Sequence, residues 1–148
     1  MTDVRFYRVA DEFGAFSNFA PYSIEVEGEV WPTSEHYFQA QKFEDADYRE
    51  RIRGTPSPMI AARLGRSRKE RLRRDWEYVK LDVMRTAVRA KFRQHEGLRE
   101  LLLATGDKTI VEHTEKDAYW GDGGDGSGKN MLGQILMEVR DELRRDGR

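Results

Sequence analysis

The chain contains no cysteine, and this absence is the first limit on its chemistry. Disulfide bonds and thiolate metal sites are excluded. The three histidines, His36, His95 and His113, show no metal-ligand spacing, so we expect no metal site. No apolar run approaches the roughly 20 residues that cross a membrane, and the N-terminus lacks the apolar core of a signal peptide. We therefore expect a cytoplasmic protein.

Charge, in contrast, is abundant. Charged residues make up 36% and hydrophobic residues 38% of the 148 residues, a composition typical of a soluble globular protein. A chain of this length forms one domain that buries roughly two thirds of its unfolded surface. The prediction is a single domain over residues 1–148.

The positive charge is concentrated in the middle of the chain. Residues 63–94 carry twelve basic and four acidic side chains, a local net charge of +8, although the whole chain has a net charge of −1. This basic block begins with Arg63, Arg66 and Arg68. Such a patch attracts phosphate groups, but a solvated helix face has the same composition. Both interpretations stay open.

Apolar periodicity and turn residues predict a helix-rich α+β fold with a few short strands. Strands are expected at residues 3–9 and 109–113, and a hairpin around residues 24–30 that bends at Glu27-Gly28. Residues 68–74 fit a helix or a charged turn. Helices are expected at residues 31–44, 47–53, 57–65, 76–94 and 98–104, and along the apolar stripe from Leu132 to Leu143.

The segment Trp31–Phe43 contains the first candidate site. A hydroxyl residue, Thr33 or Ser34, is typical of a helix N-cap. Glu35 and Lys42 are seven positions apart, about two helical turns, so we expect them on one face. Aromatic residues on several sides indicate a buried helix. The pair is then either a partly exposed ion pair or an acid and an amine in a pocket wall with shifted pKa values.

A glycine-rich loop, Tyr119–Asn130, contains the second candidate site. Its glycines let a substrate approach the backbone, and the N-terminus of the next helix is expected to offer free amides to a phosphate or a sugar. Asp122 beside Trp120 places a carboxylate next to an aromatic ring. The alternative is a surface turn whose aspartates face water and whose tryptophan is part of the core.

Gly123–Lys129 matches the first part of a nucleotide-binding P-loop. Asn130 replaces the magnesium-binding Ser or Thr of that motif, and the strand at residues 109–113 ends well before the first glycine. Asp122 would also repel phosphate. A nucleoside triphosphatase is therefore rejected.

Four motifs, in this order, resemble the YbiA-like family, also called the NADAR family. Together they span essentially the whole chain, which makes the resemblance far more specific than a short glycine pattern. The motifs are Phe16-Ser17-Asn18-Phe19, the Trp31–Phe43 segment, Ser57-Pro58-Met59 with Ala61-Ala62-Arg63, and Tyr119–Asn130 with Leu132-Gly133.

This resemblance implies an N-glycosidase with the family's compact α+β fold and no metal or redox cofactor. Members are associated with phosphoribosylamino-pyrimidine intermediates of early riboflavin synthesis and with ADP-ribose attached to guanine, including ADP-ribosylated DNA. In both, a ribose anomeric carbon is bonded to an exocyclic amine near a phosphate. We expect hydrolysis of that C–N bond and no membrane partner.

The resemblance also assigns residues, which we expect to lie around one sugar. The acidic helix position falls on Glu35, the helix lysine on Lys42, the loop residues on Trp120, Gly121, Asp122 and Asn130, and the Ser-Asn-Phe turn on Asn18 and Phe19.

Cleavage of a ribose–amine bond requires protonation of the amine and stabilisation of an electron-deficient sugar. Glu35 is the candidate acid and base. A neutral Lys42 could attack the anomeric carbon and form a Schiff base with the opened ribose. Alternatively, water attacks directly and Lys42 binds phosphate. Asp122 could hold the ribose hydroxyls or act as the base.

The remaining candidates are substrate-binding residues. Trp76 or Trp120 could stack the leaving base, although Trp76 fits a core position equally well. Arg63 is a candidate phosphate contact, together with the next arginines of the basic block. Asn18 could bond the sugar or base, or merely hold its turn. The basic block also supports a different class of function, a binding module for ADP-ribose or nucleic acid without turnover.

Overall fold

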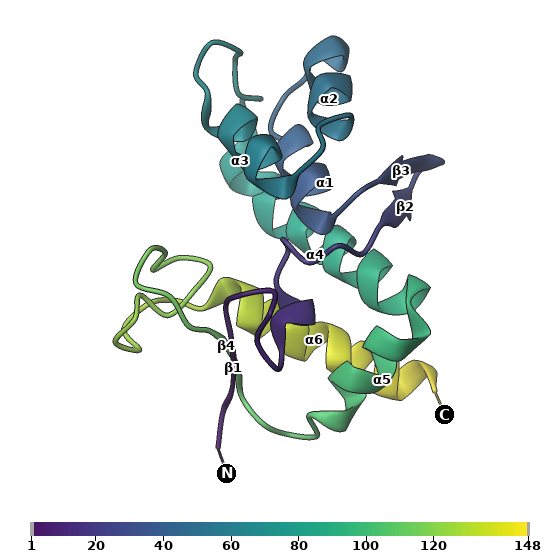
Figure 1. The fold of residues 1–148 in the computed structure, drawn as a ribbon, viewed down its shortest axis with the longest axis vertical. Coiled ribbons are helices and arrows are strands. Elements are labelled where there is room, and N and C mark those ends of the chain that lie inside the picture. Colours follow the sequence, from purple (N-terminus) through teal and green to yellow (C-terminus); the bar gives the residue numbers. More distant parts are fainter. Residues whose placement is uncertain (1, 148) are drawn as a thin grey trace. The chain divides into compact units, whose positions relative to one another are not determined.

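A computed structural model describes residues 2–147 of the chain (Figure 1). Helices predominate and the strands are short, which confirms the α+β class. The chain divides into two compact units, one of residues 1–20 and 92–148 and the other of residues 21–91.

The first unit contains a small parallel sheet. Strand β1 (Val4–Phe6) pairs with β4 (Ile110–Glu112), with Val4 opposite Ile110. Both strands were expected from the sequence. Their pairing was not, because it joins segments from opposite ends of the chain.

Two helices and a 3₁₀ turn complete the first unit. The turn is η1 (Gly14–Phe16), and the helices are α5 (Glu96–Ala104) and α6 (Met131–Asp146). Helix α6 packs against β4 and α5. Its apolar stripe is buried as the periodicity predicts, namely Leu132, Ile135, Leu136, Val139 and Leu143.

The second unit begins with the expected hairpin, in which β2 (Ile24–Val26) pairs antiparallel with β3 (Glu29–Trp31). Glu27 and Gly28 form its bend with φ angles of 53° and 82°. Two consecutive positive φ angles are typical of the tight turns that join twisted strands, and glycine adopts such angles without strain.

Four helices follow the hairpin: α1 (Ser34–Ala40), α2 (Ala46–Arg53), α3 (Pro58–Arg66) and α4 (Trp76–Gln94), whose last three residues are grouped with the first unit. Helix α1 packs against α2 and α3. The core of this unit is formed by Ile24, Trp31, Tyr37, Ala40, Phe43, Tyr48, Ile52, Ala61 and Ala87.

The expected helix over residues 31–44 is too long at both ends. Trp31 belongs to β3, and the side chain of Thr33 caps α1 by accepting a hydrogen bond from the His36 amide. After Ala40 the chain turns, because Phe43 forms an isolated antiparallel bridge with Leu72. That contact between segments far apart in the sequence ends the helix early.

Gly65 was expected to end α3, but the helix continues to Arg66. The glycine has a packing role instead. A Cβ atom at this position would lie 1.9 Å from Oε1 of Gln39 on α1. Residues 68–74, which fitted a helix or a charged turn, form turns and a single bridge.

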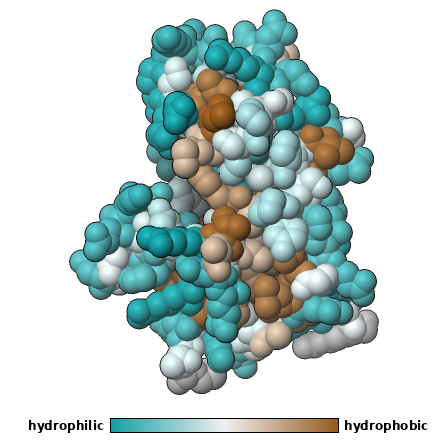
Figure 2. All heavy atoms as spheres, viewed as in Figure 1, coloured by the Kyte–Doolittle hydropathy of each residue, from teal (hydrophilic) through white to brown (hydrophobic). Residues whose placement is uncertain are grey.

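Figure 2 shows hydrophilic side chains over most of the visible face, with hydrophobic residues in separate small groups. This pattern agrees with the high fraction of charged residues. Among residues 2–147, no helix has both the length and the apolar character needed to span a bilayer.

Candidate active site

Three polar residues of α1 and the turn after it, Glu35, Gln39 and Lys42, are here called the α1 cluster. Glu35 is only 8% exposed and Gln39 6%. Nε2 of Gln39 donates a hydrogen bond of 2.7 Å to Oε2 of Glu35, one helical turn away. Glu35 is therefore a buried carboxylate, not a solvated surface charge.

Lys42 lies in the turn after α1, and the charge of Glu35 affects the pKa of its amine. Burial lowers the pKa of its amine most strongly; Glu35 raises this pKa, and Arg68 and Arg66 lower it, leaving it below its ordinary value. Nζ lies over the Phe38 ring, 5.7 Å from the centroid, and has no hydrogen-bond or salt-bridge partner among the described residues. A lowered pKa favours the neutral amine, the form that acts as a nucleophile.

Two arginines of the basic block affect Lys42 directly. Arg66 ends α3 and Arg68 follows it, and both side chains are exposed. Arg63, exposed on the same helix, is not among the charges that shift the pKa of Lys42. Arg66 and Arg68 are therefore better placed than Arg63 to bind a phosphate near the α1 cluster. The role of Arg63 stays a prediction.

Trp76 forms part of the aromatic surroundings of the cluster. It is 8% exposed at the start of α4, and its ring meets Phe38 edge-on at 5.2 Å between centroids. The same Phe38 ring lies under Lys42. Trp76 thus has the core position that the helical stripe predicts, and its stacking against a leaving base stays a prediction.

In the glycine loop, Tyr119–Asn130, Asp122 is the central residue. Its carboxylate is 6% exposed and accepts hydrogen bonds from the Thr114 amide (3.0 Å), the Gly124 amide (2.9 Å) and Nδ1 of His113 (2.8 Å). Burial raises the pKa of Asp122. The hydrogen bonds from His113, Gly124 and Thr114 together lower this pKa by more than burial raises it, so the net pKa is below its ordinary value. Asp122 is ionised and organises the loop.

Asn130 also binds the backbone of its own unit. It adopts a left-handed conformation with φ 52° immediately before α6. Its Oδ1 accepts from the Glu112 amide at 3.0 Å, and its Nδ2 donates to the Ile110 carbonyl at 2.9 Å. The side chain therefore fastens the end of the loop to β4. A role in substrate binding stays a prediction.

The free amides expected at the start of α6 are not there. The amides of Met131 and Leu132 donate to the carbonyls of Tyr119 and Trp120, at 3.0 and 3.1 Å. The loop thus uses these two donors itself, and the expectation of free amides was wrong for Met131 and Leu132.

The glycines of the loop pack it against itself. A Cβ atom on the buried Gly121 would lie 2.9 Å from the carbonyl oxygens of Asp117 and Glu112. The Gly128 amide donates to the Asp122 carbonyl at 2.8 Å. These backbone groups are directed into the loop itself, whereas a P-loop directs its amides toward phosphate. The packing therefore agrees with the rejection of a P-loop.

The other predicted residues of the first unit lie in two places. Asn18 is buried and Phe19 is 37% exposed in the turn after η1, where the Phe19 amide donates to Oγ of Ser17. Trp120 is half-buried and meets Tyr119 edge-on at 4.9 Å.

The predicted site residues are thus divided between the units. Glu35, Lys42, Arg63 and Trp76 belong to residues 21–91, and the predicted residues of the Ser-Asn-Phe turn and the glycine loop belong to the other unit. Within the second unit the structure brings Glu35 and Lys42 together, whereas the arrangement of all these residues around one sugar stays a prediction.

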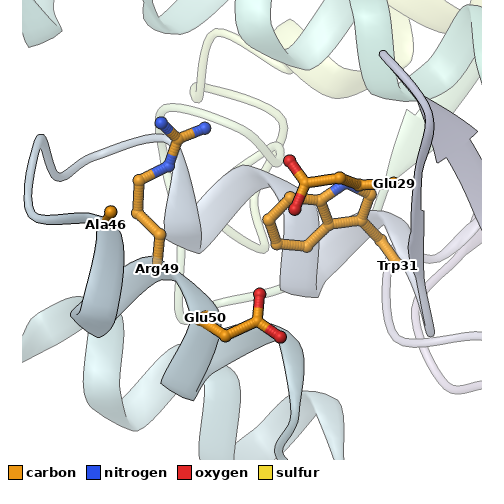
Figure 3. A pocket seen from close by; sticks show the side chains of 5 residues that line it. All are labelled: Glu29, Trp31, Ala46, Arg49 and Glu50. Carbon is orange, nitrogen blue, oxygen red and sulfur yellow. The ribbon is translucent and has the colours of Figure 1, made fainter.

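One cavity, of about 200 Å³, lies beside the glycine loop. Asp122 and Asn130 line it together with Asp3, Arg5, Val111, Gly126 and Gly128. A smaller cavity of about 100 Å³ is lined by Glu29, Trp31, Ala46, Arg49 and Glu50 from β3 and α2 (Figure 3). It contains none of the predicted site residues.

Two buried residues were missed by the sequence analysis. Gln39 was not singled out. Lys91 is 1% exposed on α4, its Nζ lies 5.8 Å from the Tyr22 ring centroid, and burial lowers its pKa to about 7. Its position four residues, about one helical turn, after the apolar Ala87 was the available signal.

No group of three or more His, Cys, Asp or Glu side chains within residues 2–147 is arranged to hold a metal ion.

Comparison with known proteins places this geometry in context. N-glycosidase YbiA of Escherichia coli (strain K12) is 62% identical over 142 residues, which cover 96% of this chain and 89% of that protein. An N-glycosidase of Nostoc punctiforme is 46% identical over 144 residues, covering 95% and 92% of the two chains. A riboflavin biosynthesis protein of Vibrio vulnificus is 49% identical over 140 residues, 95% of this chain but 38% of that protein.

The fold agrees with these relationships. The NMR structure of E. coli YbiA matches with a TM-score of 0.91 and 60% identity, over 99% of this chain and 89% of that one. Relatives of this similarity carry the name N-glycosidase, and this chain is accordingly an enzyme that hydrolyses N-glycosidic bonds. Because the NADAR domain matches residues 5–144, the chain belongs to the NADAR family.

Proposed function

We propose that the enzyme hydrolyses the bond between a ribose anomeric carbon and an exocyclic amine, with phosphoribosylamino-pyrimidine intermediates of riboflavin synthesis as its substrates. The riboflavin biosynthesis proteins of Vibrio vulnificus and Zea mays, 49% and 42% identical, support this substrate class. The observation that carries the proposal is the amine of Lys42, which is half-buried, has a lowered pKa and lies in the field of Glu35.

In the proposed reaction Glu35 first accepts a proton from Lys42. The neutral Nζ attacks the anomeric carbon, the bond from this carbon to the exocyclic nitrogen breaks, and Glu35 returns the proton to the leaving amine. Transfer of an Nζ proton to the ring oxygen opens the sugar and leaves a Schiff base. Water then adds to the anomeric carbon and releases ribose phosphate and Lys42.

Arg66 and Arg68 supply the phosphate contacts in this proposal. Both are exposed, and both act electrostatically on Lys42. Guanidinium groups bind phosphate oxygens in pairs of charge-assisted hydrogen bonds. They also make Lys42 easier to deprotonate, because neighbouring positive charges disfavour its protonation.

The covalent step is tested by borohydride reduction during turnover. Reduction of the Schiff base would leave a ribose phosphate adduct on Lys42, which peptide mass spectrometry locates. Lys42→Arg should form no adduct, and Lys80→Arg, at a partly buried lysine of α4 paired with Glu77, should behave as the wild type. Turnover without an adduct would instead support direct attack by water, with Lys42 as a phosphate ligand.

ADP-ribose attached to guanine is the second candidate substrate, and the basic block favours it because nucleic acid and diphosphates are both anionic. Incubation with each substrate separates the possibilities. Released ribose phosphate or ADP-ribose identifies the substrate. Tight retention of an intact ligand by the wild-type protein would instead support a binding module without turnover.

A further inference from the structure

Gln39 is a buried amide that the proposed reaction does not use. It lies one helical turn after Glu35, and its Nε2 donates to Oε2 of Glu35 at 2.7 Å. Both side chains are less than a tenth exposed. A hydrogen bond so protected from water restricts the orientation of both side chains.

The orientation of the Gln39 amide depends on the charge of Glu35. An ionised carboxylate only accepts hydrogen bonds, so the NH₂ end of Gln39 has to face it. In the reversed orientation two oxygens would meet and repel. The bond as it stands stabilises the ionised form of Glu35, the form that accepts a proton from Lys42 in the proposed reaction.

The other end of the same amide faces α3. Oε1 of Gln39 is buried and has no hydrogen-bond partner among the described residues. A Cβ atom at Gly65 would lie 1.9 Å from this oxygen and 2.6 Å from Cδ of Gln39. The absence of a side chain at position 65 therefore leaves the space that the amide occupies.

An unpartnered buried oxygen destabilises the folded state. A leucine or methionine would fill the same space without that cost, but neither could donate to Glu35. Gly65 therefore leaves space for the Gln39 amide, and this amide in turn donates a hydrogen bond to Glu35.

We propose that Gln39 is a positioning residue, which holds the Glu35 carboxylate in place and in its ionised state, and that Gly65 provides the room for it. This inference rests on the proposed function, in which Glu35 transfers protons. It adds a supporting contact from α1 and a space from α3 to the pair that carries the chemistry.

The test compares Gln39→Leu with the wild type by two measurements. Carbon-13 NMR titration of the glutamate carboxyl groups gives the pKa of Glu35 directly, and we expect it to rise by about one unit when the hydrogen bond is lost. The acidic limb of the pH–rate profile should shift to higher pH by the same amount. We expect kcat to fall about ten- to hundredfold from misplacement, with KM little changed.

Gly65→Ala should produce the same shifts without a change on α1, because the added Cβ displaces the amide of Gln39. Two matched controls isolate the effect. Gln41→Leu removes a glutamine amide that accepts from Arg49, and Gly97→Ala adds a methyl group where nothing lies within 4 Å. Both controls should keep the wild-type pKa of Glu35 and the wild-type rate.

Thermal unfolding first shows which variants are folded. If Gln39→Leu does not fold, Gln39→Glu tests the same link, because two facing carboxyl groups would share a proton and raise the pKa of Glu35. An unchanged Glu35 titration in a folded, active Gln39 variant overturns the inference. A wild type that turns over neither substrate overturns the proposed function instead.

Discussion

The α1 cluster and the glycine loop both contain buried or partly buried charged residues, but they differ in how these residues are hydrogen-bonded. Asp122 in the loop is buried, and its carboxylate is satisfied by two amides and a histidine of its own unit. Lys42 is partly buried with a lowered pKa, and its Nζ has only an aromatic ring as its contact among the described residues. In the loop, the charge of Asp122 holds the backbone in shape through hydrogen bonds. In the α1 cluster, the Lys42 amine is partly buried, which disfavours its charged form.

This difference indicates where the chemistry is carried. A group with a perturbed pKa beside an opposite charge costs stability and is a candidate for reaction. A group such as Asp122, whose hydrogen bonds are all made to neighbouring segments of its own unit, has a structural role that accounts for its burial. The match of both segments to family motifs therefore does not separate the two roles, but hydrogen bonding does.

Among the variants considered, Lys42→Met should lower the activity most. It tests directly whether the α1 cluster carries the chemistry. Loss of the nucleophile should lower kcat by more than about a thousandfold. Lys80→Met, the same change at a partly buried lysine on α4 that pairs with Glu77, should keep the wild-type rate. Equal activity of the two variants would remove the chemical role of the α1 cluster.

The double change Arg66→Ala with Arg68→Ala should raise KM for the phosphorylated substrate by roughly ten- to a hundredfold, because two charge-assisted contacts are lost. The pKa of Lys42 should also rise, since both arginines lower it, so the activity should need a higher pH. Steady-state kinetics over a pH series measure both effects. Arg85→Ala, which removes an arginine paired with Asp82, is the matched control.

Asp122→Ala tests the other half of the comparison. Loss of three hydrogen bonds to a buried carboxylate should lower the free energy of unfolding by about 2–3 kcal/mol, measured by urea denaturation. Asp125→Ala, at an exposed aspartate of the same loop, should leave stability nearly unchanged. A stable but inactive Asp122→Ala would instead support the predicted role of Asp122 in catalysis.

The pH dependence of Asp122 has a defined sign. Its folded-state pKa is below the ordinary value of an aspartate, so its contribution to stability is present above about pH 4. That contribution disappears as the pH falls through the lowered pKa. Asp122→Ala should therefore show weaker acid destabilisation than the wild type.

Lys91 is expected to affect the pH dependence of stability and not the reaction, because the proposed mechanism does not use it. Its pKa of about 7 in the fold is below the ordinary 10.5, so between these values the unfolded chain binds more protons. Stability should rise with pH in that window by up to about 1.4 kcal/mol per unit. Lys91→Met should flatten this slope in denaturation curves; equal slopes would contradict it.

Much of the local structure could be predicted because it depends on neighbouring residues. The Glu27-Gly28 bend, the Pro58 start of α3 and the bounds of α4 followed from turn chemistry and helical periodicity. The pairing of β1 with β4 and the early end of α1 could not be predicted, because each depends on a contact with a distant segment.

The candidate site shows the same division. Motif resemblance singled out Glu35, Lys42 and Asp122. It could not tell that the Asp122 carboxylate accepts hydrogen bonds from its own unit while Nζ of Lys42 has no such partner among the described residues. Nor could it find Gln39, because the role of that amide depends on the approach of Gly65 from another helix.

Most of the helices and strands, the family resemblance and the residue types available for reaction could be derived from the sequence, because they follow from local propensity and from motifs along the chain. Which of those residues have their hydrogen bonds satisfied, and which have a shifted pKa, depends on the packing of the fold. Burial and hydrogen bonding are set by what packs around a side chain, and in this protein those neighbours come from other helices and strands.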